Sequence, residues 1–314
     1  MCERKMGLFA ILERHYKVLI TFLALVLAVG YVHKLCWPHK EGDKFEYGYY
    51  AYESWNEGKM RWTWRRGRTL IKATSDLFGF KVAAAGYNST GSEGLEFKLF
   101  LDGEMMDKVH FFDGGSRCLY YYVPNVEGKE VEIGTEVDKT FNLLRMKISE
   151  DGRELGVAVS PVSFLKIMPR DGVGFYKWEI WREGKGRGQR TDEGKRFRWT
   201  GKRASVSIAD WGMRNAEKGE RWEIFLKCKH PDVVDEAVVV RISDERGLLR
   251  TVIFERMEWR KVVLGGDELK DSKVVTFEVS RTWNPKRMGV SGDNRDLGVA
   301  LATDTHGQIQ TSRD

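Results

Sequence analysis

Residues 293–301 read DNRDLGVAL, and residues 151–159, 142 positions earlier, read DGRELGVAV. Two other phrases precede each of these stretches, in the same order. The pattern Gly-aromatic-Tyr-x-x-Glu occurs as GYYAYE at residues 48–53 and as GFYKWE at residues 174–179. Arg-Trp-Thr then follows at residues 61–63 and 198–200. Three phrases repeated in one order, within two stretches of domain size, indicate a tandem duplication.

Beyond residue 45 the chain consists of short apolar runs separated by turn residues. The runs are rich in β-branched and aromatic residues and partly alternate, which is typical of strands, and no long segment has a helical period. Clusters such as SDERG and GGDE supply turns. The sequence therefore predicts an all-β fold of two tandem antiparallel β-sandwich, jelly-roll-like domains. The expected strands are LEFKLFLD, CLYYYV, FNLLRMKIS, RASVSIA, RWEIFLK, AVVVRIS, LLRTVIFE and KVVTFEVS.

The N-terminal region contains an uncharged stretch, VLITFLALVLAVGYV, at residues 18–32. With its flanks it is long enough for one helix to cross a lipid bilayer, and Lys17 and Lys34 lie where they could reach the two interfaces. The slight excess of basic residues before it places the N-terminus in the cytoplasm and the bulk outside. The alternative is a cleaved signal peptide, because Ala28-Val29-Gly30 is rich in small residues.

These patterns give a complete division of the chain. We expect a cytoplasmic N-terminus (1–15), a transmembrane helix (16–37), a first β-sandwich (45–160), a linker (161–173), a second β-sandwich (174–303) and a polar tail (304–314). We refer to the two sandwiches as unit one and unit two.

The four cysteines do not form a disulfide framework. Only Cys118 and Cys228 lie in the folded bulk, one in each unit and both in apolar, strand-like runs. We expect two buried thiols, with an interdomain disulfide as the alternative. No pair has the spacing of a zinc site, and no metal or cofactor is predicted.

The closing phrase, Asp-x-Arg-acidic-Leu-Gly-Val-Ala, has a physical interpretation. Its Asp can bond backbone amides in a turn, and its Arg can reach the Glu of the opening phrase as a bidentate pair. First and last strands would then be held together, although the same residues could instead surround a ligand. The residues concerned are Glu53, Asp151 and Arg153 in unit one, and Glu179, Asp293 and Arg295 in unit two.

Tryptophans beside polar loops are the candidates for ligand binding. Trp55 and Trp181 each border such a loop and could stack on sugar rings, whereas Trp62 and Trp199, inside Arg-Trp-Thr, are expected in the core. Residues 182–198 hold seven basic residues against three acidic ones. This stretch is interpreted either as a solvated hairpin loop or as a patch for phosphate, lipid headgroups or acidic polysaccharide. Its candidate ligand-binding residues are Arg187, Arg190 and Arg196.

The second unit, with GFYKWE, FRWTGKRASVSI and SRTWNPKRMGVSGDNRDLGVAL, resembles β-sandwich accessory domains of bacterial cell-envelope glycosyltransferases and polysaccharide-assembly membrane proteins. The resemblance covers both units, from about residue 45 to residue 303. The transferase core is absent, so the resemblance implies an accessory module with no catalytic residues. Unit one lacks the Trp-Asn-Pro element of Thr282–Pro285, and we expect a shorter approach to its closing phrase.

The sequence favours a non-catalytic function. It contains no HExxH, GxSxG, dinucleotide or EF-hand motif, although a pair of glycosidase carboxylates from distant strands stays open. The net charge of +6 is too mild for a nucleic-acid binder of this size. We expect a membrane-anchored, extracytoplasmic protein that binds or organises envelope carbohydrate, and that has the bilayer and a membrane protein as partners. The alternatives are a structural scaffold in an envelope complex and a glycan-active enzyme.

Overall fold

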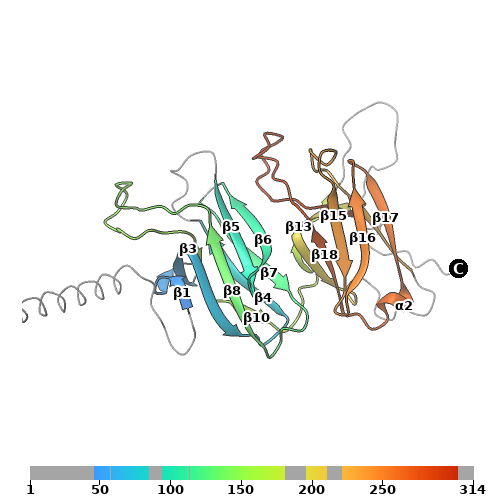
Figure 1. Cartoon of the computed structure of the whole chain (residues 1–314), viewed down its shortest axis with the longest axis horizontal. Helices are drawn as coiled ribbons and strands as arrows, with labels where there is room; N and C mark the ends of the chain where they lie inside the picture. Colours follow the sequence, from blue (N-terminus) through green and yellow to red (C-terminus); the bar gives the residue numbers. More distant parts are fainter. Residues whose placement is uncertain are drawn as a thin grey trace, which may run out of the picture.

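The computed structural model describes residues 46–56, 58–84, 94–112, 114–180, 196–210 and 221–302. Within these ranges the chain forms two β-structured units side by side (Figure 1). Unit one consists of β1 (Glu46–Tyr49), β2 (Glu53–Trp55), β3 (Gly58–Lys72), β4 (Leu77–Ala83), β5 (Leu95–Leu101), β6 (Glu104–Phe111), β7 (Ser116–Tyr122), β8 (Glu130–Val137), β9 (Ala158–Val159) and β10 (Ser163–Leu165). Unit two consists of β11 (Val173–Phe175), β12 (Glu179–Ile180), β13 (Arg196–Ser207), β14 (Arg221–Lys227), β15 (Val238–Ser243), β16 (Leu248–Phe254), β17 (Trp259–Gly265), α2 (Gly266–Leu269), β18 (Val274–Val279) and β19 (Ala300–Ala302).

Each unit has two antiparallel layers joined by one long strand. In unit one the later part of β3 pairs with β1 and β8, and the layer continues through β5 to β6. The first part of β3 pairs with β2 and β9, and this second layer continues through β4 to β7. Because β3 changes partners near Trp62, it belongs to both layers.

Unit two repeats this topology around β13. Its later part pairs with β11 and β18, followed by β15 and β16, and its first part pairs with β12 and β19, followed by β14 and β17. Every described strand of unit two therefore has a counterpart in unit one. The prediction of an all-β tandem of antiparallel β-sandwiches is confirmed, while the finer jelly-roll assignment stays a prediction. The additional strand β10 lies in the expected linker and extends the second layer of unit one by pairing with β4.

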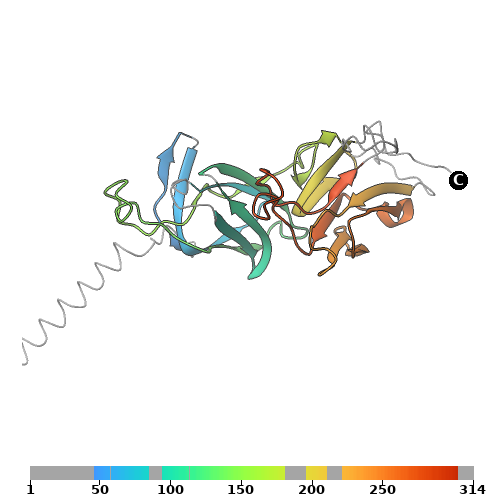
Figure 2. The ribbon, with the colours of Figure 1, turned by 90° about the horizontal axis from the view of Figure 1, so that it is seen from above.

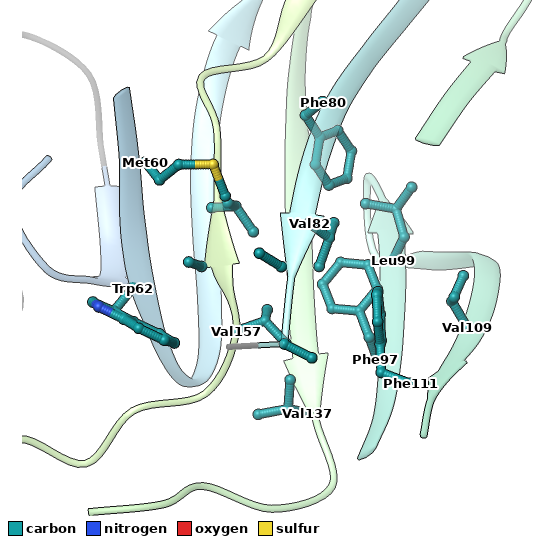
Figure 3. Close-up of a cluster of buried hydrophobic side chains, with 14 of the residues drawn as sticks. Met60, Trp62, Phe80, Val82, Phe97, Leu99, Val109, Phe111, Val137 and Val157 are labelled. Carbon is teal, nitrogen blue, oxygen red and sulfur yellow. The ribbon is translucent and has the colours of Figure 1, made fainter. Parts of the chain in front are cut away.

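The core of each unit lies between its layers. In β5 every second residue is buried, namely Leu95, Phe97 and Leu99, and Figure 3 shows Phe97 and Leu99 pointing toward Val82 and Phe80 of the opposite layer. β14 alternates in the same way, as expected for strands with one apolar face. Trp62 and Trp199 are 7% and 5% exposed, so their expected core position is confirmed.

Edge strands meet where the two units join. β6 and β7 end the two layers of unit one, and they contact the short edge strand β11 and the long shared strand β13 of unit two. Exposed edges are prone to pairing with other chains, and here unit two covers part of the edges of unit one. Figure 2 shows the loop of residues 283–297, in dark red, lying at this junction.

Three expectations are corrected. The run FNLLRMKIS does not form a strand, because the side chain of Asn142 accepts the N–H of Arg145 and donates to the carbonyl of Gly152, which closes a turn. Cys118 and Cys228 are both free, but Cys118 is exposed on β7 and only Cys228 is buried. The approach to the closing phrase is not shorter in unit one: Phe141 bridges to Leu155, as Trp283 bridges to Leu297, at equal spacing.

Among the described residues no helix is long and apolar enough to cross a membrane. The expected transmembrane helix (16–37), cytoplasmic N-terminus (1–15) and polar tail (304–314) lie outside the described residues and stay predictions.

Candidate functional site

The closing phrase of unit two is bonded to its Arg-Trp-Thr phrase. The Thr200 N–H donates to the Val299 carbonyl, and the Gly298 N–H donates to the Thr200 carbonyl. The Val299 N–H donates to the Thr200 side chain at 3.0 Å. Unit one repeats all three bonds with Thr63 in place of Thr200. Two of the repeated phrases thus form one structural element, which attaches the last strand to the strand shared by both layers.

The opening and closing phrases also meet through ion pairs. In unit two the Arg295 guanidinium lies 2.7 Å from a carboxylate oxygen of Asp293 and 2.7 Å from one of Glu179. It also lies 5.2 Å from the centre of the Tyr176 ring, whose hydroxyl donates to the Asp296 carbonyl. We name this arrangement the Arg295 staple.

Unit one contains the same arrangement, the Arg153 staple. Arg153 lies 2.7 Å from Asp151 and 2.8 Å from Glu53, over the ring of Tyr50. The structure thus brings the six motif residues together in two sets of three. None of the three hollows described below is lined by them, which favours the structural interpretation over a ligand site.

The staples predict a contribution to acid sensitivity. Hydrogen bonds from the Arg153 guanidinium hold the pKa of the Asp151 carboxyl below its ordinary value. In Asp293 burial acts in the raising direction, but bonds from Arg295 outweigh it and lower the pKa. A carboxyl whose pKa is depressed in the folded state stabilises the fold above the unfolded-state pKa of about 3.9, and this stability is lost as pH falls through the folded pKa.

We therefore expect Asp151→Asn with Asp293→Asn to lower the free energy of unfolding by about 1–2 kcal/mol at neutral pH and by less near pH 3. Urea unfolding at both pH values measures the difference. Asp235→Asn, at an exposed carboxylate, is the control. A deficit that stays equal at the two pH values would show that the staple carboxylates do not contribute to acid sensitivity.

Trp55 borders an open hollow at one end of unit one. The hollow has a volume of about 730 Å³ and lies between the β2–β3 hairpin and the adjoining ends of β4 and β7. The half-buried Trp55 ring packs against Trp62, with ring centroids 5.4 Å apart, so the buried Trp62 holds its orientation. The lining residues are Ser54, Trp55, Asn56, Ala83, Gly114, Gly115 and Ser116. A fixed aromatic ring beside polar groups is an arrangement that can hold a sugar ring.

Of the other four residues predicted to bind a ligand, one lies within the described part of the chain and three lie outside it. Arg196 is described: it is exposed at the start of β13, with its guanidinium 5.3 Å from the centre of the Trp178 ring. Trp181, Arg187 and Arg190 lie outside the described residues. Within the described part of the chain, therefore, Trp55 and Arg196 lie in different units.

A buried polar cluster joins the two units. One oxygen of the Asp296 carboxylate accepts a hydrogen bond from the backbone N–H of His110 at 2.7 Å. The other oxygen lies 2.8 Å from the ring nitrogen Nδ1 of His110. On the other side of the imidazole, Nε2 lies 2.9 Å from Arg287 and 3.1 Å from Glu96. His110 is 7% exposed and Asp296 is 5% exposed. We name this cluster the His110–Asp296 clamp.

Sequence reasoning did not find the clamp. Asp296 of the clamp corresponds to Glu154 in unit one. Glu154 is partly exposed and pairs within its own unit with Arg145 at 3.0 Å. The signal in the sequence is the change from Glu154 to Asp296, which is one of three differences between the two closing phrases. The acidic position of the closing phrase has therefore acquired a second use, which joins the units.

A polar hollow of about 700 Å³ adjoins the clamp. It is lined by Glu96, His110, Phe112, Asp138, Lys139, Lys286 and Arg287. Among the described residues, no group of three or more His, Cys, Asp or Glu side chains is arranged to hold a metal ion.

Comparison with known proteins gives no family for the chain. No protein-family model matches it, and no curated protein matches its sequence. Among solved structures, it is similar to the M60 catalytic domain with the CBM51-1 and CBM51-2 domains of Clostridium perfringens ZmpB, at 11% identity and a TM-score of 0.22, over 78% of this chain and 34% of that one. The chain thus spans about a third of that protein's length.

Two further similarities cover most of the other protein. A family 35 carbohydrate binding module from Clostridium thermocellum matches 39% of this chain and 93% of its own, at 11% identity and a TM-score of 0.23. The CBM22-1–CBM22-2 tandem of Paenibacillus barcinonensis Xyn10C matches 86% of this chain and 93% of its own, at 8% identity and a TM-score of 0.22. At these TM-scores the similarities carry no inference about function.

Proposed function

We propose that this chain is a membrane-anchored, extracytoplasmic protein whose tandem β-sandwiches bind cell-envelope carbohydrate without converting it. The observation that carries the proposal is the hollow at Trp55. The ring of Trp55 is held by Trp62 and stays partly exposed beside Ser54 and Asn56. Such a ring can stack on the apolar face of a sugar, while the neighbouring polar groups bond its hydroxyls.

The proposed membrane anchor and the location outside the cytoplasm rest on the sequence. The uncharged stretch at residues 18–32 and its flanking lysines fit a single signal anchor with a cytoplasmic N-terminus. The resemblance to accessory domains of envelope glycosyltransferases agrees with this orientation and adds a membrane protein as the expected partner. In this arrangement both units are outside the cytoplasm.

Binding of the full chain, purified in a mild detergent, to an array of envelope glycans tests the proposal. We expect Trp55→Ala to weaken binding at least about tenfold, because it removes the stacking surface and leaves the layers of the sandwich in place. Tyr47→Ala, which removes a 37% exposed ring on β1 outside the hollow, is the matched control.

Two results would contradict the proposal. Equal binding by wild type and Trp55→Ala would show that the hollow is not the binding site. Binding to no glycan on the array would contradict carbohydrate binding itself. The same preparation tests the anchor, since alkaline extraction should leave the full chain in the membrane pellet. Release into the supernatant would contradict anchoring.

A scaffold is the second candidate, and one observation favours it. On the loop of residues 141–155, Leu144 and Ile148 are 54% and 56% exposed, which leaves two large apolar side chains of one loop open to solvent. Exposed apolar groups of this kind fit a protein contact. Loss of a membrane-protein partner in Leu144→Ser with Ile148→Ser, together with an array that shows no glycan binding, would favour the scaffold.

A further inference from the structure

A cleft lies between the two units, separate from the Trp55 hollow. It has a volume of about 320 Å³ and is formed by β6 and β7 of unit one and by β11 and β13 of unit two. Neither unit alone encloses it. This size is at the lower end of the range of about 300–1,000 Å³ for small-molecule sites, so it suits one small polar ring better than a long chain.

The carboxyl groups of the cleft have their bonds within the protein. Asp107 accepts the hydroxyl of Tyr121 at 2.8 Å and the N–H of Lys108 at 2.7 Å, and burial raises the pKa of its carboxyl. Asp296 is held in the clamp with His110. Neither carboxyl forms an ion pair with Lys202 or Arg203 in the described part of the chain, although the charge of Lys202 acts on Asp107.

The basic groups of unit one in the cleft also have partners. The Lys108 ammonium lies 3.3 Å from Glu96, and the Arg117 guanidinium donates to the Asn294 carbonyl and lies over the Phe111 ring. Lys108 and Arg117 thus already have partners for their charged groups within the protein.

Two adjacent cations on β13 are less well compensated. The nearest carboxylate to the Arg203 guanidinium is Glu278, at 3.9 Å, and the buried Arg203 Nε has no hydrogen-bond partner among the described residues. Burial lowers the pKa of Arg203, so its charge is only partly solvated. Lys202 lines the same cleft, where its charge acts on the Asp107 carboxyl without an ion pair between them among the described residues. A partly buried cation whose nearest carboxylate is 3.9 Å away is poorly compensated, and a bound anion would improve its compensation.

The rest of the lining narrows the chemistry of this anion. The aromatic rings and the glycine backbone of the lining have contacts within the protein: the Arg198 guanidinium lies 3.6 Å from the centre of the Phe175 ring, and the Gly172 N–H donates to the Pro169 carbonyl. A small ring with hydroxyl groups and one acidic substituent fits a cleft of this volume that is lined by two cations and by other polar side chains.

We propose that this cleft binds a carboxylate-bearing sugar unit, with Lys202 and Arg203 as the residues that hold the carboxylate. The site is distinct from the Trp55 hollow and stands without it. Because both units line the cleft, the bound sugar stabilises their association as well as each fold, by mass action on the native state.

Matched monosaccharides test the chemistry directly. Glucuronate and glucose differ only in the group at C6, and glucose 6-phosphate presents a phosphate at the same place. In ligand-observed NMR titrations of the full chain in detergent, we expect glucuronate to bind at least about tenfold more tightly than glucose, and to weaken as salt is raised from about 50 to 500 mM. Equal binding of glucuronate and glucose, or binding of glucose 6-phosphate alone, would overturn the proposed ligand class.

Variants test the residues. Lys202→Gln with Arg203→Gln should weaken glucuronate binding at least about tenfold, whereas Arg203→Lys should weaken it less, because the positive charge remains while the guanidinium geometry is lost. Arg256→Gln, at a side chain 77% exposed, is the control. Circular dichroism melts verify that each variant is folded, and unchanged glucuronate binding in a folded double variant overturns the proposal. Trp55→Ala should leave glucuronate binding intact, so failure at one site is distinguishable from failure at the other.

Discussion

Replacing Gly298 by alanine is expected to lower the free energy of unfolding of unit two by about 3 kcal/mol. A Cβ at this position would lie 2.4 Å from Oγ1 of Thr200 and 2.6 Å from the carbonyl oxygen of Gly201. Both atoms belong to the strand shared by the two layers, and Thr200 is tied to Val299 on either side of the contact. The strand cannot withdraw without breaking these bonds, so the overlap must be relieved by separating the last strand from β13.

The duplication supplies a replicate of this experiment within one chain. Gly156 has the same surroundings in unit one, with a Cβ 2.5 Å from Oγ1 of Thr63 and 2.6 Å from the carbonyl oxygen of Trp64. Gly156→Ala should therefore destabilise unit one by a similar amount and leave unit two unchanged. Urea unfolding followed by circular dichroism and tryptophan fluorescence measures both transitions.

Gly292→Ala is the control, because a Cβ there would meet nothing within 4 Å and the residue is exposed. We expect it to change stability by less than about 0.5 kcal/mol. If Gly298→Ala were equally silent, the close approach of Gly298 to Thr200 would not be what holds the last strand in place.

The repeat explains why much of the fold could be predicted. Phrases that recur in order, such as the closing phrase that contains Gly298, keep their local contacts after duplication, so both copies obey one set of geometric constraints. The expected pairing of Arg295 with Glu179 followed from chemistry alone, and the structure places these side chains 2.7 Å apart. The expected bidentate geometry was wrong, because Arg295 makes one bond to Glu179 and directs its Nε and second terminal nitrogen to Asp293. Strand positions followed from alternation wherever one face is buried, as in β5 and β14.

Predictions failed where side-chain bonding overrides pattern. The apolar run after Phe141 has the composition of a strand, but two hydrogen bonds of the Asn142 side-chain amide close it into a turn. Comparison with Asn284, which bonds in the same way in unit two, could have revealed this: the alignment of FNLLRMKISEDGREL with WNPKRMGVSGDNRDL preserves the asparagine and the spacing.

The junction between the units could not be predicted from the repeat. His110 and Asp296 are 186 residues apart, and their contact depends on how two finished sandwiches dock. His110 belongs to no repeated phrase, and the acidic position that Asp296 occupies in the closing phrase does not indicate its partner, because docking joins strands and one loop of two different units. The cleft at Lys202 and Arg203 exists for the same reason, since its walls come from different units.

Replacing Asp296 by alanine is expected to separate the units and to lower the free energy of unfolding by about 3 kcal/mol. The carboxylate meets the N–H and the imidazole of His110 and lies 3.3 Å from the side-chain amide of Asn284. His110, Asn284 and Asp296 are each more than nine-tenths buried. Removal of the Asp296 carboxylate therefore leaves the polar groups of His110 and Asn284 without their acceptor in a poorly solvated junction. Small-angle X-ray scattering should show a larger maximum dimension, and urea unfolding should show the loss of stability.

Glu154→Ala is the matched control, because Glu154 occupies the same position of the repeated phrase but its side chain is 33% exposed and pairs with an arginine 79% exposed. We expect it to cost less than about 1 kcal/mol and to leave the scattering profile unchanged. A double-mutant cycle of Asp296→Ala with His110→Ala should give a coupling energy above about 1 kcal/mol, since each residue is the other's partner. Additive effects, or a compact Asp296→Ala protein of wild-type stability, would mean that edge packing and not the clamp joins the two units.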